Sequence, residues 1–142
     1  LLEQLDLERV AIADALGLKV KTIFEHFSSS FQVPIASISE MNQQMHAKGK
    51  SGTGPTTADS RYVTEDVPYG LQLTAILGRL VGKQPKLHEA GIEIFSAMYD
   101  RDFSHENKLL NVLELDQVSL TDLQQAARTG LLQAAPRKVS QS

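Results

Sequence analysis

The sequence predicts an all-α fold, an irregular bundle of about six helices, on the strength of three observations. Apolar residues recur at helical spacing in segment after segment. Glycine, proline and small polar residues separate those segments, and no stretch of useful length alternates as a strand does. With 142 residues, 42% hydrophobic and 22% charged, the chain suits one globular domain. We expect residues 1–132 to form this helical domain and residues 133–142 to form a flexible polar tail.

Two apolar stripes predict the helices of the N-terminal part. The first helix ends at Gly17. Its apolar residues are Leu2, Leu5, Ile12, Ala13 and Leu16. The second stripe falls on one helix face and consists of Val20, Ile23, Phe24, Phe27 and Phe31. After a break at Pro34, a short polar helix is expected over residues 39–48.

The second half of the chain begins with a loop and continues with four helices. Residues 49–60 contain three glycines and a proline among small polar residues, which predicts a long loop inside the domain. The expected helices span residues 65–81, 85–99 and 109–113, with a last helix capped by Ser119 and closed by Gly130. The buried face of the 85–99 helix is expected to contain Leu87, Gly91, Ile94, Phe95 and Met98.

Composition excludes several classes of function. A net charge of −3 gives no general attraction to nucleic acid or to an anionic membrane. The most apolar stretch, residues 67–81, is too short and too polar to span a bilayer. The absence of cysteine removes disulfides, thiol nucleophiles and thiolate metal sites, and it fits a cytoplasmic location. The chain opens with Leu1 rather than methionine, and we expect it to be part of a longer protein.

Three short motifs fail when their spacing is examined. Gly49, Lys50 and Ser51 imitate the end of a phosphate-binding loop, but the required earlier glycine is replaced by Gln44. The four histidines form no helical metal pair, so no metal site is predicted, and each is expected at the surface or at its boundary. The serines of residues 28–30 lack the context of a hydrolase nucleophile.

The segment of residues 60–71 carries the candidate site. Arg61 precedes the 65–81 helix, and a guanidinium there can hold a carboxylate with two parallel hydrogen bonds. Asp66 lies in the first turn of that helix, where a carboxylate can orient a base. The simpler interpretation is that Asp66 only favours the helix dipole and that Arg61 pairs with Asp66 or Asp59. Composition and periodicity alone favour this simpler interpretation.

The block Arg-Tyr-Val-Thr-Glu-Asp-Val-Pro-Tyr-Gly-Leu at residues 61–71 closely resembles the signature of the octopine/nopaline (opine) dehydrogenase family. Weaker similarity extends from about residue 5 to about residue 130, including residues 77–80 and 98–103. The resemblance implies the C-terminal helical domain of such an enzyme, similar to the domains that accompany Rossmann folds in the 6-phosphogluconate dehydrogenase superfamily. Family members condense an α-keto acid with an amino acid and reduce the imine.

The resemblance also implies roles for two residues. Arg61 matches the arginine that holds a substrate carboxylate, and Asp66 matches the aspartate that pairs with the catalytic histidine. NAD or NADP would be bound mainly by an N-terminal Rossmann domain, because no segment here resembles its glycine-rich fingerprint. None of the four histidines lies in a motif that matches the catalytic one. This chain alone is therefore expected to be inactive.

Two functions remain open at this point. As the substrate domain of an opine dehydrogenase, the chain should direct Arg61 and Asp66 into one shared cleft. An apolar patch should also lie where the Rossmann domain docks. The alternative is a non-catalytic helical module for dimerisation or partner binding, with the two side chains exposed separately. Homodimer formation stays open under both, and the sequence selects neither the keto acid nor the amino acid.

Overall fold

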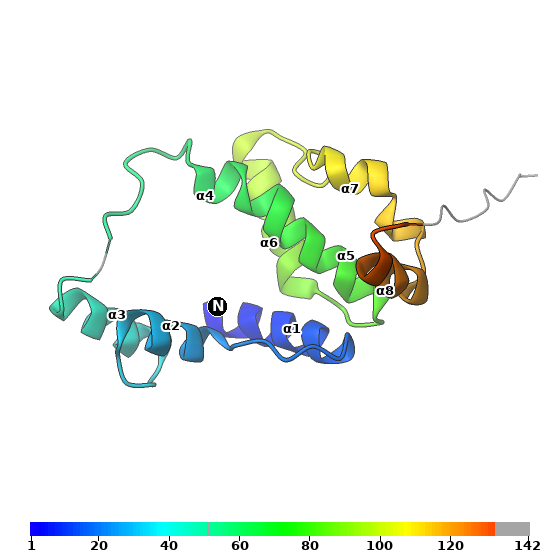
Figure 1. The fold of residues 1–142 in the computed structure, drawn as a ribbon. Coiled ribbons are helices and arrows are strands. Elements are labelled where there is room, and N and C mark those ends of the chain that lie inside the picture. The colour runs from blue at the N-terminus through cyan, green and yellow to red at the C-terminus, as the bar shows by residue number, and fades with distance from the viewer. Residues whose placement is uncertain (51, 133–142) are drawn as a thin grey trace, which may run out of the picture.

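The computed structural model describes residues 1–50 and 52–132, and this part of the chain is all-helical, as predicted (Figure 1). The tail predicted for residues 133–142 lies outside the described residues. In chain order the helices are α1 (Leu2–Ala15), α2 (Ile23–Phe31), α3 (Ile38–Ala47), α4 (Arg61–Thr64), the π-helix η1 (Asp66–Leu71), α5 (Gln72–Leu80), α6 (Lys86–Tyr99), α7 (Lys108–Leu113), the 3-10 helix η2 (Leu115–Gln117) and α8 (Leu120–Thr129).

Helices α2 and α3 form an arm that extends away from the helices of the second half (Figure 1). Each begins with a full capping box, Thr22 with Glu25 and Ser37 with Glu40. The phenylalanines of α2 pack against the methionines of α3. The small core of the arm consists of Val33, Ile38, Met41 and Met45, covered by Ile23, Phe24, Phe27, Phe31 and Ala36.

The main core lies where η1, α5 and α6 meet. Val67, Ala75, Ile92 and Phe103 are buried there together. A neighbouring cluster joins Ile76 of α5 to the C-terminal segment through Leu110, Leu115 and Val118, with Leu123 of α8 packed against it. Val118 and Leu123 therefore pack in one cluster, as expected for a hydrophobic staple before α8.

Helix α1 packs across α5 and α6 and is fixed there by one carboxylate. Glu8 accepts hydrogen bonds from the backbone N–H groups of Leu87 and His88, with N–O distances of 2.9 to 3.3 Å. These N–H groups belong to the first turn of α6, which has no partners for them within the helix. A side chain from the first helix thus caps a helix that begins nearly eighty residues later.

The helix predicted over residues 65–81 is present over residues 66–80, but its first part is not an α-helix. The π-helix η1 runs directly into α5, and the separate short helix α4 precedes them. Pro68 has no N–H, so the carbonyl of Thr64 loses its regular α-helical donor and the register widens to a π turn, with the Gln72 N–H bonded to the carbonyl of Val67. The carbonyl of Pro68 accepts instead from the buried side chain of Asn107, at 3.1 Å.

Two predictions about apolar faces are partly wrong, although Phe95 of α6 packs against the main core as expected. On α6, Ile94 is 58% exposed and Met98 is 70% exposed, whereas the buried residues are His88 and Ile92. The apolar stripe read from the sequence lies beside the packed face, because contact with η1, α5 and α1 rather than periodicity decides which side is covered. Val20 lies before α2 and is exposed.

In the described part of the chain, every helix is too short or too polar to cross a bilayer.

Candidate active site at the start of the central helix

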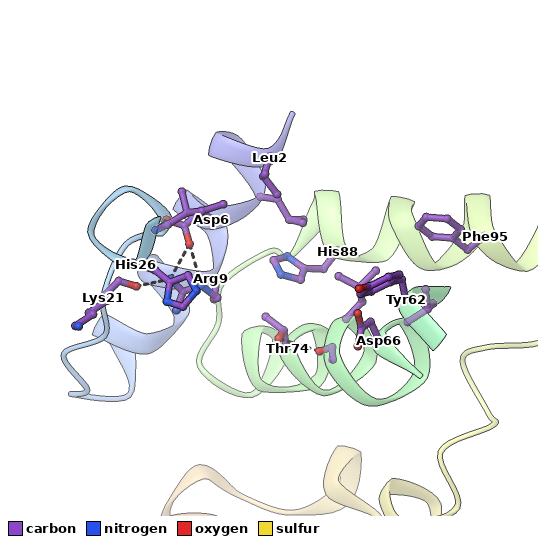
Figure 2. A pocket seen from close by; sticks show the side chains of 15 residues that line it. Leu2, Asp6, Arg9, Lys21, His26, Tyr62, Asp66, Thr74, His88 and Phe95 are labelled. Atoms are coloured by element: carbon purple, nitrogen blue, oxygen red, sulfur yellow. Dashed lines mark hydrogen bonds and ion pairs between the residues drawn. The ribbon is translucent and has the colours of Figure 1, made fainter. Parts of the chain in front are cut away.

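A cavity with a volume of about 870 Å³ lies between α1 with its following segment on one side and η1, α5 and α6 on the other (Figure 2). Its walls are mostly apolar, with Leu2, Leu5 and Phe95 among them. The polar residues that line it are Asp6, Arg9, Lys21, His26, Tyr62, Asp66, Thr74 and His88. A mainly apolar hollow with a few polar groups is typical of a small-molecule site.

Asp66 lines this cavity as the first residue of the π-helix. Its side chain is exposed and has no hydrogen-bond or ion-pair partner among residues 1–50 and 52–132. A carboxylate without a protein partner at the start of a helix is favoured by the local dipole and stays available to another group.

Arg61 lies one helical turn before Asp66, in an adjoining hollow of about 400 Å³. Its side chain is 84% exposed and donates from Nε and Nη2 to the two carboxylate oxygens of Glu65, at 2.8 and 2.9 Å. The described partner of Arg61 is therefore Glu65, whereas the sequence interpretation named Asp59 or Asp66. This hydrogen-bonded pair, with the nearby charge of Asp66, raises the pKa of Arg61.

Tyr62 and Asp66 line both hollows, so the two candidate residues Arg61 and Asp66 lie at adjoining openings. The smaller hollow is lined by Ser60, Arg61, Tyr62, Glu65 and Asp66. Ser60 is the N-cap of the short helix α4, and its hydroxyl accepts a hydrogen bond from the N–H of Tyr62. This cap fixes the backbone at the start of α4 and therefore the point from which the side chain of Arg61 extends.

His88 is a cavity residue that the sequence interpretation missed. It was expected at the surface or its boundary, but it is only 3% exposed. Its Nδ1 lies 2.9 Å from a carboxylate oxygen of Glu8. Nothing in the local sequence indicates a partner in a helix so distant along the chain. A buried histidine held by a carboxylate is a common arrangement for fixing a tautomer.

Glu8 is ionised at neutral pH as the partner of His88. Burial acts to raise the pKa of this carboxyl, but the hydrogen bonds from the His88 ring and from the N–H groups of Leu87 and His88 outweigh it, so the pKa lies below its usual value.

The opposite wall of the cavity carries positive groups from α1 and the segment after it. Arg9 donates to Asp6 at 2.6 Å and to the carbonyl of Lys21 at 2.6 Å. Asp6 also accepts from the N–H of Ile23 at 2.8 Å, which ties the start of α2 to α1. Figure 2 shows Arg9, Lys21 and His26 grouped on this side, away from Asp66.

Among the described residues, no group of acidic or histidine side chains is arranged to hold a metal ion. Ser51, part of the rejected phosphate-loop motif, lies outside the described residues.

The fold and the cavity define an all-helical domain with a charged hollow of the size that small organic ligands occupy. The chain belongs to the NAD/NADP octopine/nopaline dehydrogenase family, whose alpha-helical domain matches residues 1–99. It is also similar to the opine dehydrogenase of Arthrobacter sp. (strain 1C), with 33% identity over 126 residues, or 89% of this chain and 35% of the relative. The chain thus spans about a third of the length of that relative.

Proposed function

We propose that residues 1–132 form the substrate domain of an opine dehydrogenase, an enzyme that condenses an α-keto acid with the amino group of an amino acid and reduces the resulting imine with NADH or NADPH. The observation that carries the proposal is the partnerless carboxylate of Asp66 on the wall of the large cavity, one turn from the guanidinium of Arg61. Membership of the octopine/nopaline dehydrogenase family supports it.

In this proposal Arg61 holds the carboxylate of the keto acid. Its Nε and Nη2 already bind the two oxygens of Glu65 in the paired geometry that a substrate carboxylate would use. An exposed ion pair of this kind contributes little to stability, so a substrate can displace Glu65 at small cost. The substrate would then lie against Tyr62 and Asp66, which line the same hollow.

Asp66 would orient and stabilise a catalytic histidine supplied by another part of the full-length protein. No histidine in the described ranges forms a hydrogen bond with Asp66. The aspartate would accept from one ring nitrogen and leave the other free to move a proton at the reacting carbon–nitrogen or carbonyl centre.

Residues 1–50 and 52–132 contain no strand, and the pyrophosphate of NADH or NADPH is typically bound at a strand-to-helix turn. We therefore assign the cofactor to another part of the full-length protein and assign no step of hydride transfer to this domain.

The proposal is tested by steady-state kinetics of the full-length protein with panels of keto acids and amino acids. Arg61→Ala should raise KM for the keto acid about 10- to 100-fold, because a charged hydrogen-bonded contact is lost. Asp66→Asn should lower kcat about 100-fold or more, because the histidine loses its orienting carboxylate. Arg79→Ala and Asp102→Asn remove exposed charges outside both hollows and serve as matched controls. Unchanged kinetics in both site variants would exclude these roles.

The alternative, a non-catalytic helical module, finds some support in the exposed apolar side chains of Ile94 and Met98 on α6. It requires Arg61 and Asp66 to be exposed separately. They line one common hollow instead, and this favours the enzymatic function.

A further inference from the structure

His88 presents one ring nitrogen to the large cavity. The side chain is 4% exposed, and its Nδ1 is bound to Glu8. In the described part of the chain, every buried side-chain nitrogen or oxygen has a hydrogen-bond partner, so a nitrogen without one is not buried. Nε2 of His88 has no partner among these residues. Because His88 lines the cavity, Nε2 faces the open space of the cavity. Figure 2 shows the ring between α1 and the helix that carries Thr74.

The hydrogen bonds around His88 determine whether Nε2 donates or accepts a hydrogen bond in the cavity. Glu8 also accepts from two backbone N–H groups and is ionised, so it is an acceptor toward Nδ1 as well. The proton of a neutral ring therefore lies on Nδ1, and Nε2 is left as an acceptor.

A further acceptor lines the same cavity. The hydroxyl of Thr74 donates its proton to the carbonyl of Gly70 at 3.0 Å, which leaves only lone pairs toward the cavity. A wall made of the His88 nitrogen and the Thr74 oxygen is complementary to a ligand group that carries more than one N–H donor.

We propose that His88, held by Glu8, is a substrate-binding residue that accepts a hydrogen bond from the amino group of the amino-acid substrate. This inference rests on the proposed function. Of the two substrates, the keto acid carries only acceptor oxygens, which this wall would repel. The amino group is the N–H donor, and it must be oriented for its nitrogen to attack the keto carbon. Arg9, which is paired with Asp6, and the cation Lys21 lie across the cavity, where Lys21 favours the carboxylate end of the same substrate.

The test uses the full-length enzyme and the variant His88→Asn. An asparagine amide can donate to Glu8 from a position near that of Nδ1, but it offers nothing at the position of Nε2. The hydrogen bond to Glu8 is thus kept, while the proposed hydrogen bond from the substrate amino group to Nε2 is lost. We expect KM for the amino acid to rise about 10-fold, with KM for the keto acid and the thermal unfolding midpoint unchanged. His105→Asn is the matched control, because His105 is exposed and pairs with Asp102 outside the cavity.

Two simple inhibitors separate the amine contact from other contacts. n-Butylamine carries only the amino group, and n-butyrate carries only the carboxylate. In His88→Asn the inhibition constant of butylamine should rise about 10-fold, while that of butyrate should stay the same. An unchanged KM for the amino acid, or equal weakening of both inhibitors, would overturn the assignment.

Calorimetric titration of butylamine into the full-length protein gives a readout that does not depend on turnover. Binding that is present in the natural protein and lost in His88→Asn would support the amine site even if no pair of keto acid and amino acid is consumed. Absence of turnover with all pairs would then count against the proposed function alone. Equal butylamine binding in both proteins would count against His88 alone.

Discussion

At the scale of single residues, this domain depends on contacts between distant positions. Arg61 and Asp66 could be predicted as a pair of candidates because they lie in one short block of sequence. The partner of Arg61 could not, since Glu65, Asp59 and Asp66 are all within reach of a long side chain. Glu8 and His88 could not be predicted at all, because only the packing of α1 on α6 brings them together.

The lowered pKa of Glu8 has a consequence for stability. The pKa of Glu8 in the folded protein lies below its unfolded value of about 4.3. The carboxylate therefore makes its full contribution to the free energy of unfolding above the unfolded pKa. This contribution is lost as the pH falls through the lowered pKa of the folded protein. Glu8→Gln should reduce the free energy of unfolding at pH 7 by about 1–3 kcal/mol, since two backbone N–H groups and a buried ring lose a charged acceptor.

Chemical denaturation of Glu8→Gln and the natural protein between pH 7 and pH 3 measures this contribution. The difference between the two proteins should shrink below about pH 4. Glu93→Gln, an exposed substitution on the same helix as His88, is the control and should leave stability unchanged. A Glu8→Gln difference that stayed constant down to pH 3 would contradict the ionised role.

At the scale of elements, helix ends and turn signals could be predicted more reliably than helix interiors. The start of α6 and the Ser119 cap of α8 lie where the sequence indicates them. The π-helix could not be predicted, because proline is tolerated in the first turn of an α-helix and the sequence did not reveal that α4 already precedes it. The exposed face of α6 was predicted wrongly for a similar reason, since an apolar stripe in the sequence does not show which other helices will cover it.

The crossing of α1 over α5 depends on Gly78. A Cβ atom at this position would lie 3.0 Å from Ile12 Cδ1 and 3.1 Å from two atoms of the buried Pro85. Pro85 is rigid, so Gly78→Ala should destabilise the fold by about 1–2 kcal/mol despite its better helix propensity. Gly91→Ala meets only Leu71 Cδ1 at 3.4 Å and should instead stabilise by up to about 1 kcal/mol. The thermal unfolding midpoints of both variants measure these effects. If both variants were stabilised, the crossing of α1 over α5 would have space for a Cβ atom at Gly78, and this prediction would be wrong.

At the scale of the whole molecule, the fold class was predictable because helical periodicity repeats along nearly the entire chain. The site was predictable only in part. The block of residues 61–71 indicated two candidate residues, but the cavity forms between segments that are far apart in the sequence, α1 and η1 with α5 and α6. Leu2 and Tyr62, both exposed, line its opening and leave apolar surface where another part of a full-length enzyme could close the site.

The most direct measurement of the central claim follows NADH or NADPH oxidation by the full-length protein, with mass spectrometry of the product. We expect oxidation only when a keto acid and an amino acid are both present, with one secondary amine formed per cofactor oxidised. Asp66→Asn should slow this reaction about 100-fold or more without loss of folded protein. A full-rate Asp66→Asn enzyme, or cofactor oxidation that yields only a hydroxy acid, would contradict the account.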